Sequence, residues 1–262
     1  MVKILMKSPI KDLTKKAPLA LRVLKELIPK GSIVDSYLFY SGEIEFNLCG
    51  NQRFINAHTT SYYIYEFWTS LFDESQNIYD IASSELFKFK PEMFPILQEY
   101  WYKYKGDPCI RAALFFLLNR CSSRGLISSG ELSTQNYNPI ALSYLKRFHR
   151  PPNFHVNHDG AEGLRGVLHP NALSDFVLVP CADFSYNLFE LGKNRGVEET
   201  SVNHAELRDT LRRGEKKWIA CYNYHPALVS FFDQETVILI DKYGRTITDA
   251  AECEVAVIYN FD

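Results

Sequence analysis

The sequence carries almost no excess charge of either sign. Its 29 lysines and arginines are balanced by 31 aspartates and glutamates, which leaves a formal net charge of −2. A strongly basic chain, the usual mark of a protein that binds nucleic acid over much of its surface, is therefore excluded. The balanced charge does not exclude a basic face of limited extent, because phosphate binding needs only a local patch of cations.

Paired cysteine motifs are also missing. The six cysteines stand singly along the chain: Cys49, Cys109, Cys121, Cys181, Cys221 and Cys253. Without CxxC or Cys/His spacing, free thiols in a reducing compartment are the expected state. His155, His158 and His169 lie near Asp159 and Glu162, but their spacing fits no zinc pattern, so we expect no metal.

Long apolar runs are absent as well. The N-terminal stretch MVKILMKSPIKDLTKK has too short an apolar run for a signal peptide, and no later run reaches the length of a membrane span. We therefore expect a soluble protein of the cytoplasm, with no membrane partner. With 46% hydrophobic and 23% charged residues, the chain has the composition of a folded globular protein.

Strand-like and helix-like patterns alternate at both ends of the chain. Residues 17–31 have apolar positions at helical spacing, and Pro29 and Gly31 end the pattern. Residues 32–42 and 52–61 read as a strand entering a turn and a second short strand. After residue 150 we expect a strand at 176–180, a helix at 203–214, a strand at 216–223, a short helix at 225–232 and a closing strand at 252–261.

The middle of the chain, about residues 62–150, is helical and rich in aromatics, with a Gly- and Ser-rich loop or hairpin at 121–139. Helical core packing explains most of these rings, although YYIYEFW and YWYKYK also suggest stacking platforms for bases. The order of the elements predicts an α/β sheet interrupted by a helical insertion.

Seven segments, in order, resemble the D12 class of DNA adenine N6-methyltransferases, the Dam-like family, over nearly the whole chain. They are KKAPLALRVLKELIPKG, LFYSGEIEFNL, RFINAHT, RAALFFLLNRCSSRGLISSG, DFVLVPCADFSY, NHAELRDTLRRGEKKWIACYNYHPALVSFF and EVAVIYNF. The resemblance implies a Rossmann-like methyltransferase domain formed by residues 1–65 and 152–262. Residues 66–151 would be an inserted helical DNA-recognition domain.

The same resemblance implies S-adenosylmethionine (SAM) as methyl donor and flipped adenine as acceptor. The donor would be held by Lys16, by Asn56 and by the loop Phe39-Tyr40-Ser41-Gly42, where glycine lets the backbone approach a ligand closely. Cations in or beside the insertion would contact DNA, or else lie at solvated helix ends: Arg111, Arg120, Arg124, Lys146 and Arg147.

Several positions depart from the family pattern. Glu43 and Ile44 stand where the donor loop has small residues, Ala57 replaces the acid that holds the ribose, and Thr14-Lys15 replaces a double glycine. The reading loop FNGL is SRGL here, at residues 123–126. Damage at three donor contacts indicates weakened or lost catalysis.

The catalytic DPPY motif can be placed in two registers. A direct count puts Pro180, Cys181, Ala182 and Asp183 over it and preserves nothing, whereas three extra residues put Asp183, Phe184, Ser185 and Tyr186 there. The second register keeps the acceptor carboxylate and the stacking ring, but loses two prolines that stiffen the turn. A strand ending in an Asx turn remains an equal alternative.

Two hypotheses follow from these residues. The chain is either a SAM-dependent adenine methyltransferase with reduced activity, or a non-catalytic descendant of that fold that binds DNA or a protein partner. The joint loss of the glycines, the ribose acid and the prolines favours the second.

Overall fold

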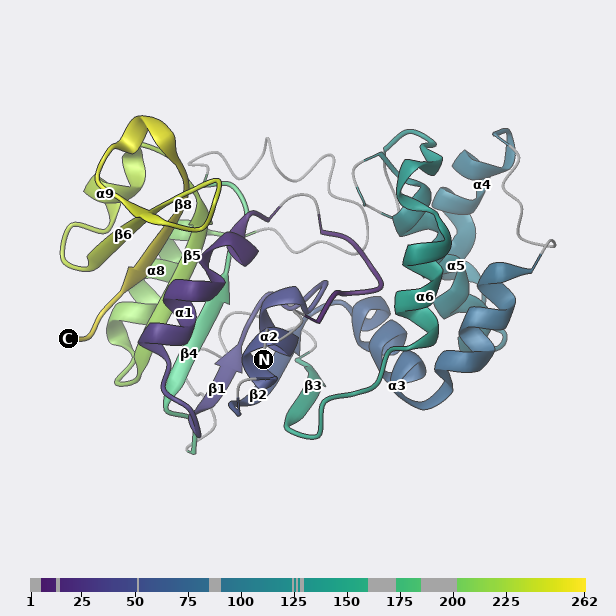
Figure 1. Cartoon of the computed structure of the whole chain (residues 1–262), viewed down its shortest axis with the longest axis horizontal. Helices are drawn as coiled ribbons and strands as arrows, with labels where there is room; N and C mark the ends of the chain where they lie inside the picture. Colours follow the sequence, from purple (N-terminus) through teal and green to yellow (C-terminus); the bar gives the residue numbers. More distant parts are fainter. Residues whose placement is uncertain are drawn as a thin grey trace.

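The computed structural model describes residues 6–12, 15–50, 52–84, 91–123, 125, 127, 130–159, 173–184 and 202–262. Figure 1 shows a sheet with its helices at one side of the molecule and a group of longer helices at the other. The chain passes from the sheet into these helices and back again, so the two chain ends both contribute to the sheet.

Within these residues the sheet has eight strands, in the order β3-β2-β1-β4-β5-β8-β6-β7. Their bounds are β1 Ile33–Ser36, β2 Phe54–Thr59, β3 Phe154–His158, β4 Phe176–Pro180, β5 Lys217–Asn223, β6 Thr236–Asp241, β7 Thr246–Ile247 and β8 Cys253–Tyr259. The first five pair in parallel, and β8 runs antiparallel to both β5 and β6. A doubly wound parallel order, followed by strand β8 running antiparallel to both of its neighbours, confirms the expected Rossmann-like methyltransferase fold.

The central strand β4 explains why the sheet needs two covering layers. All five residues of FVLVP are buried, which is typical of a parallel strand enclosed on both faces. Leu178 belongs to the core on one face, together with Val34, while Val177 and Val179 belong to the core on the other.

Helices cover both faces. The first core contains residues of the 3-10 turn η1 Ala17–Ala20, of α1 Leu21–Leu27 and of α2 Glu43–Cys49. The second contains residues of α8 His204–Arg213 and α9 Ala227–Phe231. A further 3-10 turn, η6 Ala250–Glu252, leads into β8.

The inserted helices pack on one another beside the sheet, as Figure 1 shows on its right. They are α3 Tyr62–Ser83, α4 Met93–Tyr100, α5 Pro108–Cys121 and α6 Pro139–Lys146, with 3-10 turns η3 Trp101–Lys103 and η4 Thr134–Asn136. Asp107 and Asn138 cap α5 and α6 by accepting backbone N–H groups, and proline follows each cap. The assignment of this region as a separate domain, at residues 66–151, stays a prediction.

Aromatic packing joins the insertion to the sheet. Trp68 of α3 is fully buried and contacts Phe39, Phe46 and Phe148, and its indole N–H donates to the carbonyl of Tyr40 at 2.7 Å. The helix α3 thereby holds the loop after β1 in place. Of the rings of YYIYEFW, Phe67 and Trp68 are buried in the core and Tyr63 packs against it, but Tyr62 is 50% exposed.

Three strands were not expected from the sequence. β3 lies in a polar segment that follows two prolines, and β6 and β7 lie between the short helix predicted at 225–232 and the strand predicted at 252–261. Four of the six cysteines are buried, and all six are free thiols. Within the described part of the chain, no helix combines the length and the apolar character that crossing a membrane requires.

Candidate functional site

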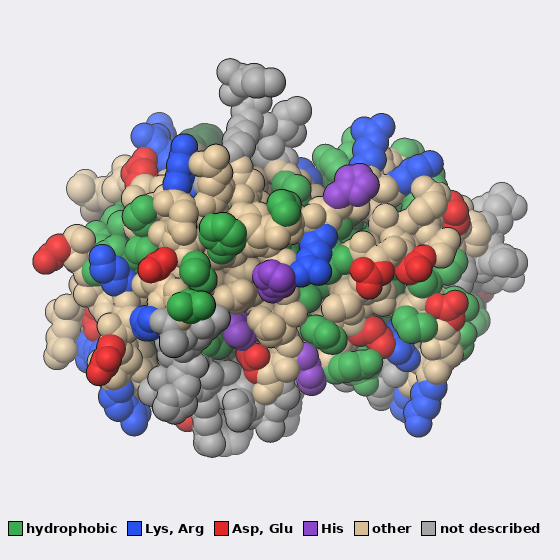
Figure 2. Space-filling view, turned by 90° about the horizontal axis from the view of Figure 1, so that it is seen from below, with side chains coloured by type: hydrophobic (Ala, Val, Ile, Leu, Met, Phe, Trp, Pro, Cys, Tyr) green, Lys and Arg blue, Asp and Glu red, His purple; other side chains and the backbone are tan. Residues whose placement is uncertain are grey.

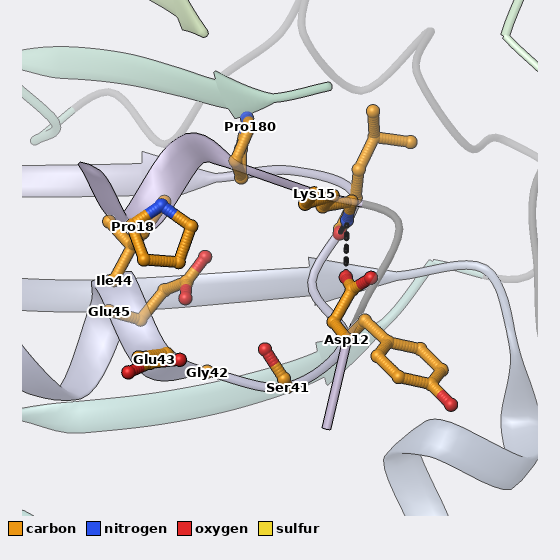
Figure 3. A pocket seen from close by; sticks show the side chains of 11 residues that line it. Asp12, Lys15, Pro18, Ser41, Gly42, Glu43, Ile44, Glu45 and Pro180 are labelled. Carbon is orange, nitrogen blue, oxygen red and sulfur yellow. Dashed lines mark hydrogen bonds and ion pairs between the residues drawn. The ribbon is translucent and has the colours of Figure 1, made fainter. Parts of the chain in front are cut away.

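A pocket lies where the strand order reverses direction, between β1 and β4. In doubly wound sheets, ligands bind at this point, beyond the carboxyl ends of the strands. The empty space between its walls, with the open solvent at its mouth included, is about 300 Å³. Its walls come from the segment before α1, from residues 38–42 after β1, from the first turn of α2 and from Pro180 (Figure 3).

The loop after β1 turns sharply at Gly42, which has φ +72°. A side chain at this position would place its Cβ 2.6 Å from Cζ of Phe46, so only glycine fits without displacing a core ring. Tyr40, Ser41 and Gly42 line the pocket, and their assignment as donor contacts stays a prediction. Phe39 does not line it: it is 2% exposed and packs in the aromatic core.

We expect Gly42→Ala to lower the free energy of unfolding by about 2 kcal/mol, since the left-handed conformation alone costs an L-residue about 1–2 kcal/mol. Gly50→Ala is the matched control, because Gly50 has φ −59° and its new Cβ would meet nothing closer than 3.4 Å. Urea denaturation of both variants measures the difference. Equal stability of the two would contradict the steric argument.

The cation of the pocket is Lys15, where Lys16 was expected. The Lys15 ammonium donates to the Leu38 carbonyl at 2.7 Å and lies 3.7 Å from the Asp12 carboxylate. Lys16 points away and pairs with Glu254. The prediction is displaced by one residue. The segment before η1 is irregular, so its sequence has no periodicity from which the inward-facing lysine could be identified.

Three carboxylates line the same pocket: Asp12, Glu43 and Glu45. Glu45 is 3% exposed and accepts a hydrogen bond from the Ser36 hydroxyl at 2.8 Å. Burial raises the pKa of this carboxyl above its ordinary value, despite opposing hydrogen bonds. Glu43 pairs with Lys7 at 3.1 Å, and Ile44 is buried. The pocket is thus acidic, with one cation that the protein itself engages.

A second polar group lies under the carboxyl ends of β1 and β2. The Asn56 amide donates to Oδ1 of Asp35 at 3.0 Å, and the Ser174 hydroxyl donates to Oδ2 at 2.5 Å. His58 Nδ1 is 3.0 Å from Asp159 Oδ1, and its Nε2 is 3.7 Å from Asp35 Oδ1. Asn56 is therefore used inside the protein and does not line the pocket, contrary to its expected donor contact.

Burial lowers the pKa of His58, but hydrogen bonds and charges of Asp159 and Asp35 outweigh it and raise the pKa to about 9. The imidazole is consequently a cation at neutral pH. Sequence reasoning did not identify this group. The available signal was an aspartate inside the apolar strand IVDS, since a buried carboxylate requires partners.

We expect stability to fall as the pH rises from about 6.5 to about 9. The folded pKa of His58 exceeds the unfolded value of about 6.5, so its contribution is complete below that value and is lost as the folded form deprotonates. The contribution is on the order of 3 kcal/mol. Urea denaturation across this range measures it, with His58→Gln as control. A decline of equal size in the control would assign it to other groups.

The segment after β4 places Asp183 at the expected edge of the sheet. Its Oδ1 accepts from the Asn223 amide at 2.7 Å, and the Asn223 amide oxygen accepts the backbone N–H of Lys16 at 2.8 Å. Asn223 therefore links the segment before α1 with the segment after β4. Sequence reasoning placed Asn223 only within a matching segment and assigned it no role.

Of the other three residues placed over the catalytic motif, the structure describes only Phe184. Phe184 is 5% exposed and packs against His204 and Phe231, so its ring is part of the core. Ser185 and Tyr186 lie outside the described residues.

The cations expected to contact DNA have different surroundings. Arg120 is 5% exposed and donates to the carbonyls of Pro9 and Ser8, which removes it from any DNA-facing surface. Arg111 forms an ion pair with Glu66. Lys146 lies over the Tyr79 ring at 4.7 Å, and Arg147 is exposed. Arg124 lies outside the described residues, and on the face in Figure 2 basic and acidic side chains intermingle.

Among the described residues, no group of histidine, cysteine, aspartate and glutamate has the arrangement of a metal site. His169 of the histidine-containing loop is not among them.

No family model matches the chain, and no curated protein matches it. The chain is similar in structure to a type I restriction-modification system methyltransferase subunit from Streptococcus thermophilus, with 9% sequence identity and a TM-score of 0.30. The match covers 96% of this chain and 46% of the other, so the chain spans less than half the length of that protein.

Proposed function

We propose that this chain is a methyltransferase-fold protein, derived from the D12 class of DNA adenine N6-methyltransferases, that no longer transfers methyl groups and acts as a DNA- or protein-binding module. The observation that carries the proposal is the charge of the side chains in the pocket between β1 and β4, which we call the switch-point pocket. Among the described residues that line it, the cation is already bonded within the protein and the other ionisable groups are acids.

Electrostatics support this proposal. SAM carries a carboxylate, and the family's loop of small residues leaves backbone N–H groups to meet the donor. Here Glu43 and Glu45 line that place, and Lys15 already donates to Leu38. An added carboxylate would meet the carboxylate of Glu43 at short range, which disfavours binding.

The end of β2 supports it independently. In the family an acid there accepts the ribose hydroxyls, whereas this chain has Ala57, which is fully buried. The flanking side chains, Asn56 and His58, are engaged with Asp35 and Asp159. No acceptor at this position is therefore directed toward a donor.

Calorimetry with SAM, followed by methyl transfer to DNA of mixed sequence, tests the loss of activity. We expect neither saturable binding at micromolar SAM nor transfer. Micromolar binding together with transfer that Asp183→Asn abolishes would overturn the proposal.

Binding to DNA is tested separately with charge reversal. Lys146→Glu combined with Arg147→Glu should weaken the binding of duplex DNA and reduce its salt dependence, since each lost phosphate contact lowers the slope by about one. Lys30→Glu combined with Lys242→Glu changes the charge equally at two other exposed positions. Equal effects of the two pairs would reject this face as the DNA contact and leave a protein partner.

One observation favours the alternative of residual adenine methylation. The Asp183 side chain is exposed, and Asn223 orients it at the end of β4, where an amine hydrogen could be accepted. For this activity, Asn223→Ala should lower the turnover number of methyl transfer even at temperatures at which the variant remains folded, because the Asn223 amide orients the carboxylate.

A further inference from the structure

The ring of His58 lies beside the carboxyl ends of β1 and β2, and we call the space it fills between Tyr37, Asp35 and Asp159 the slot. The Tyr37 ring forms one wall: the two ring centroids are 4.6 Å apart and the planes differ by 12°. Tyr37 is 3% exposed and belongs to the core on this face of the sheet. The wall is therefore held by packing and does not depend on His58 alone.

Two carboxylates lie at opposite edges of the same ring. Asp159 approaches Nδ1 with both oxygens, at 3.0 and 3.1 Å, and Asp35 lies 3.7 Å from Nε2. Asp35 is fully buried and is held by Asn56 and Ser174. Asp35 is thus oriented by groups that would remain if the imidazole were removed.

This combination is more selective than a packing contact requires. Replacing a buried ion pair by apolar residues is often neutral or stabilising, so burial alone does not call for a histidine between two acids. An aromatic face attracts cations, Asp159 accepts a hydrogen bond at one edge of the ring, and Asp35 places a carboxylate at the other edge, too far from Nε2 for a hydrogen bond. The His58 side chain remains 16% exposed, so the slot can be reached from solvent.

We propose that this slot is a binding site for planar cations that carry an N–H donor, of the imidazolium or amidinium class, and that the protein keeps it closed with its own His58 side chain. The site is separate from the switch-point pocket, and the proposal holds whether or not methyl transfer is lost.

Chemical rescue of the full-length His58→Ala protein tests the proposal. At about pH 6, where imidazole is largely protonated, added imidazole should bind saturably and raise the Tm by about 3 °C at a concentration roughly tenfold above its Kd. The wild-type protein should show no such rise. Tetramethylammonium chloride, which matches the charge but has no N–H donor, should have no effect on either protein.

Two further variants define the contacts. His58→Ala combined with Asp159→Asn should lose most of the imidazole response, because one anchoring charge is gone. His155→Ala removes an exposed histidine of β3 and should give no response. A folded His58→Ala protein that ignores imidazole, or that responds equally to tetramethylammonium, would overturn the proposal.

If His58→Ala does not fold, the wild-type protein still provides a test. Nitrogen-15 NMR of the histidine side chains should show both nitrogens of His58 protonated at about pH 8, as a clamped imidazolium requires. A neutral His58 ring at that pH would show that the two carboxylates do not hold a cation, and the proposal would fail.

Discussion

Asp35→Ala should lower the free energy of unfolding by about 3–5 kcal/mol, the usual cost of removing one partner from a buried ion pair. Asp35 is completely buried in β1, and its two oxygens accept hydrogen bonds from Asn56 and Ser174. Without it, the amide and the hydroxyl lose an acceptor that buried water cannot replace at low cost, and the His58 cation loses one of its two counter-charges.

Urea denaturation at neutral pH measures this loss, and Asp175→Ala is the matched control. Asp175 also accepts a hydrogen bond at the start of a central strand, from the Ile33 N–H at 2.8 Å, but it is exposed. Its removal should cost about 1 kcal/mol. Asp35→Asn should in addition lower the pKa of His58, because a charge that raises it is removed. A cost for Asp35→Ala no larger than the control would show that Asp35 is not an ionised partner.

Trp68→Ala should cost a similar amount, about 3–5 kcal/mol, because it leaves a large cavity among Phe39, Phe46 and Phe148. It also removes the hydrogen bond to the Tyr40 carbonyl, which holds the pocket loop. The variant should therefore loosen the loop after β1 as well as destabilise the protein.

Trp68→Phe separates the two effects. It keeps most of the ring packing but lacks the N–H donor, so we expect a loss of about 1–2 kcal/mol. Hydrogen exchange of the amides at residues 38–42 reports on the loop. Ile96→Ala, at a 50% exposed position on α4, should change stability by less than about 0.5 kcal/mol. Unchanged exchange in Trp68→Ala would refute the link between α3 and the loop.

Much of the fold could be predicted because its elements differ in hydrophobic period. The continuous apolar run at β4 and the helical spacing in α3, α5 and α8 each indicated the correct element. β3 escaped because its side chains alternate only weakly: Phe154 is buried, but His155, Asn157 and His158 are exposed, as suits an edge strand. β6 was not predicted because its apolar residues match none of the segments that resemble the family.

The pocket could be located from the sequence, but its contents could not. The turn at Gly42 and the apolar strand before Asp183 can each be recognised from neighbouring residues alone. They indicate where the strands β1 and β4 end. Whether Lys15 or Lys16 enters the pocket, and whether Asn56 turns toward a ligand or toward Asp35, depends on residues distant in sequence. The same holds for Arg120, which reads as a surface cation and is bound by backbone carbonyls more than 100 residues earlier.

The position of β8 between β5 and β6 sets the order in which the sheet can be completed. β8 follows the other seven strands in the chain, yet β6 joins the sheet only through it. During synthesis, β5 would present an unpaired, apolar edge until residues 253–259 leave the ribosome, and such edges promote association between chains. The β6–β7 hairpin must wait for the same residues, so this half of the protein is expected to form late and to rely on protection from chaperones.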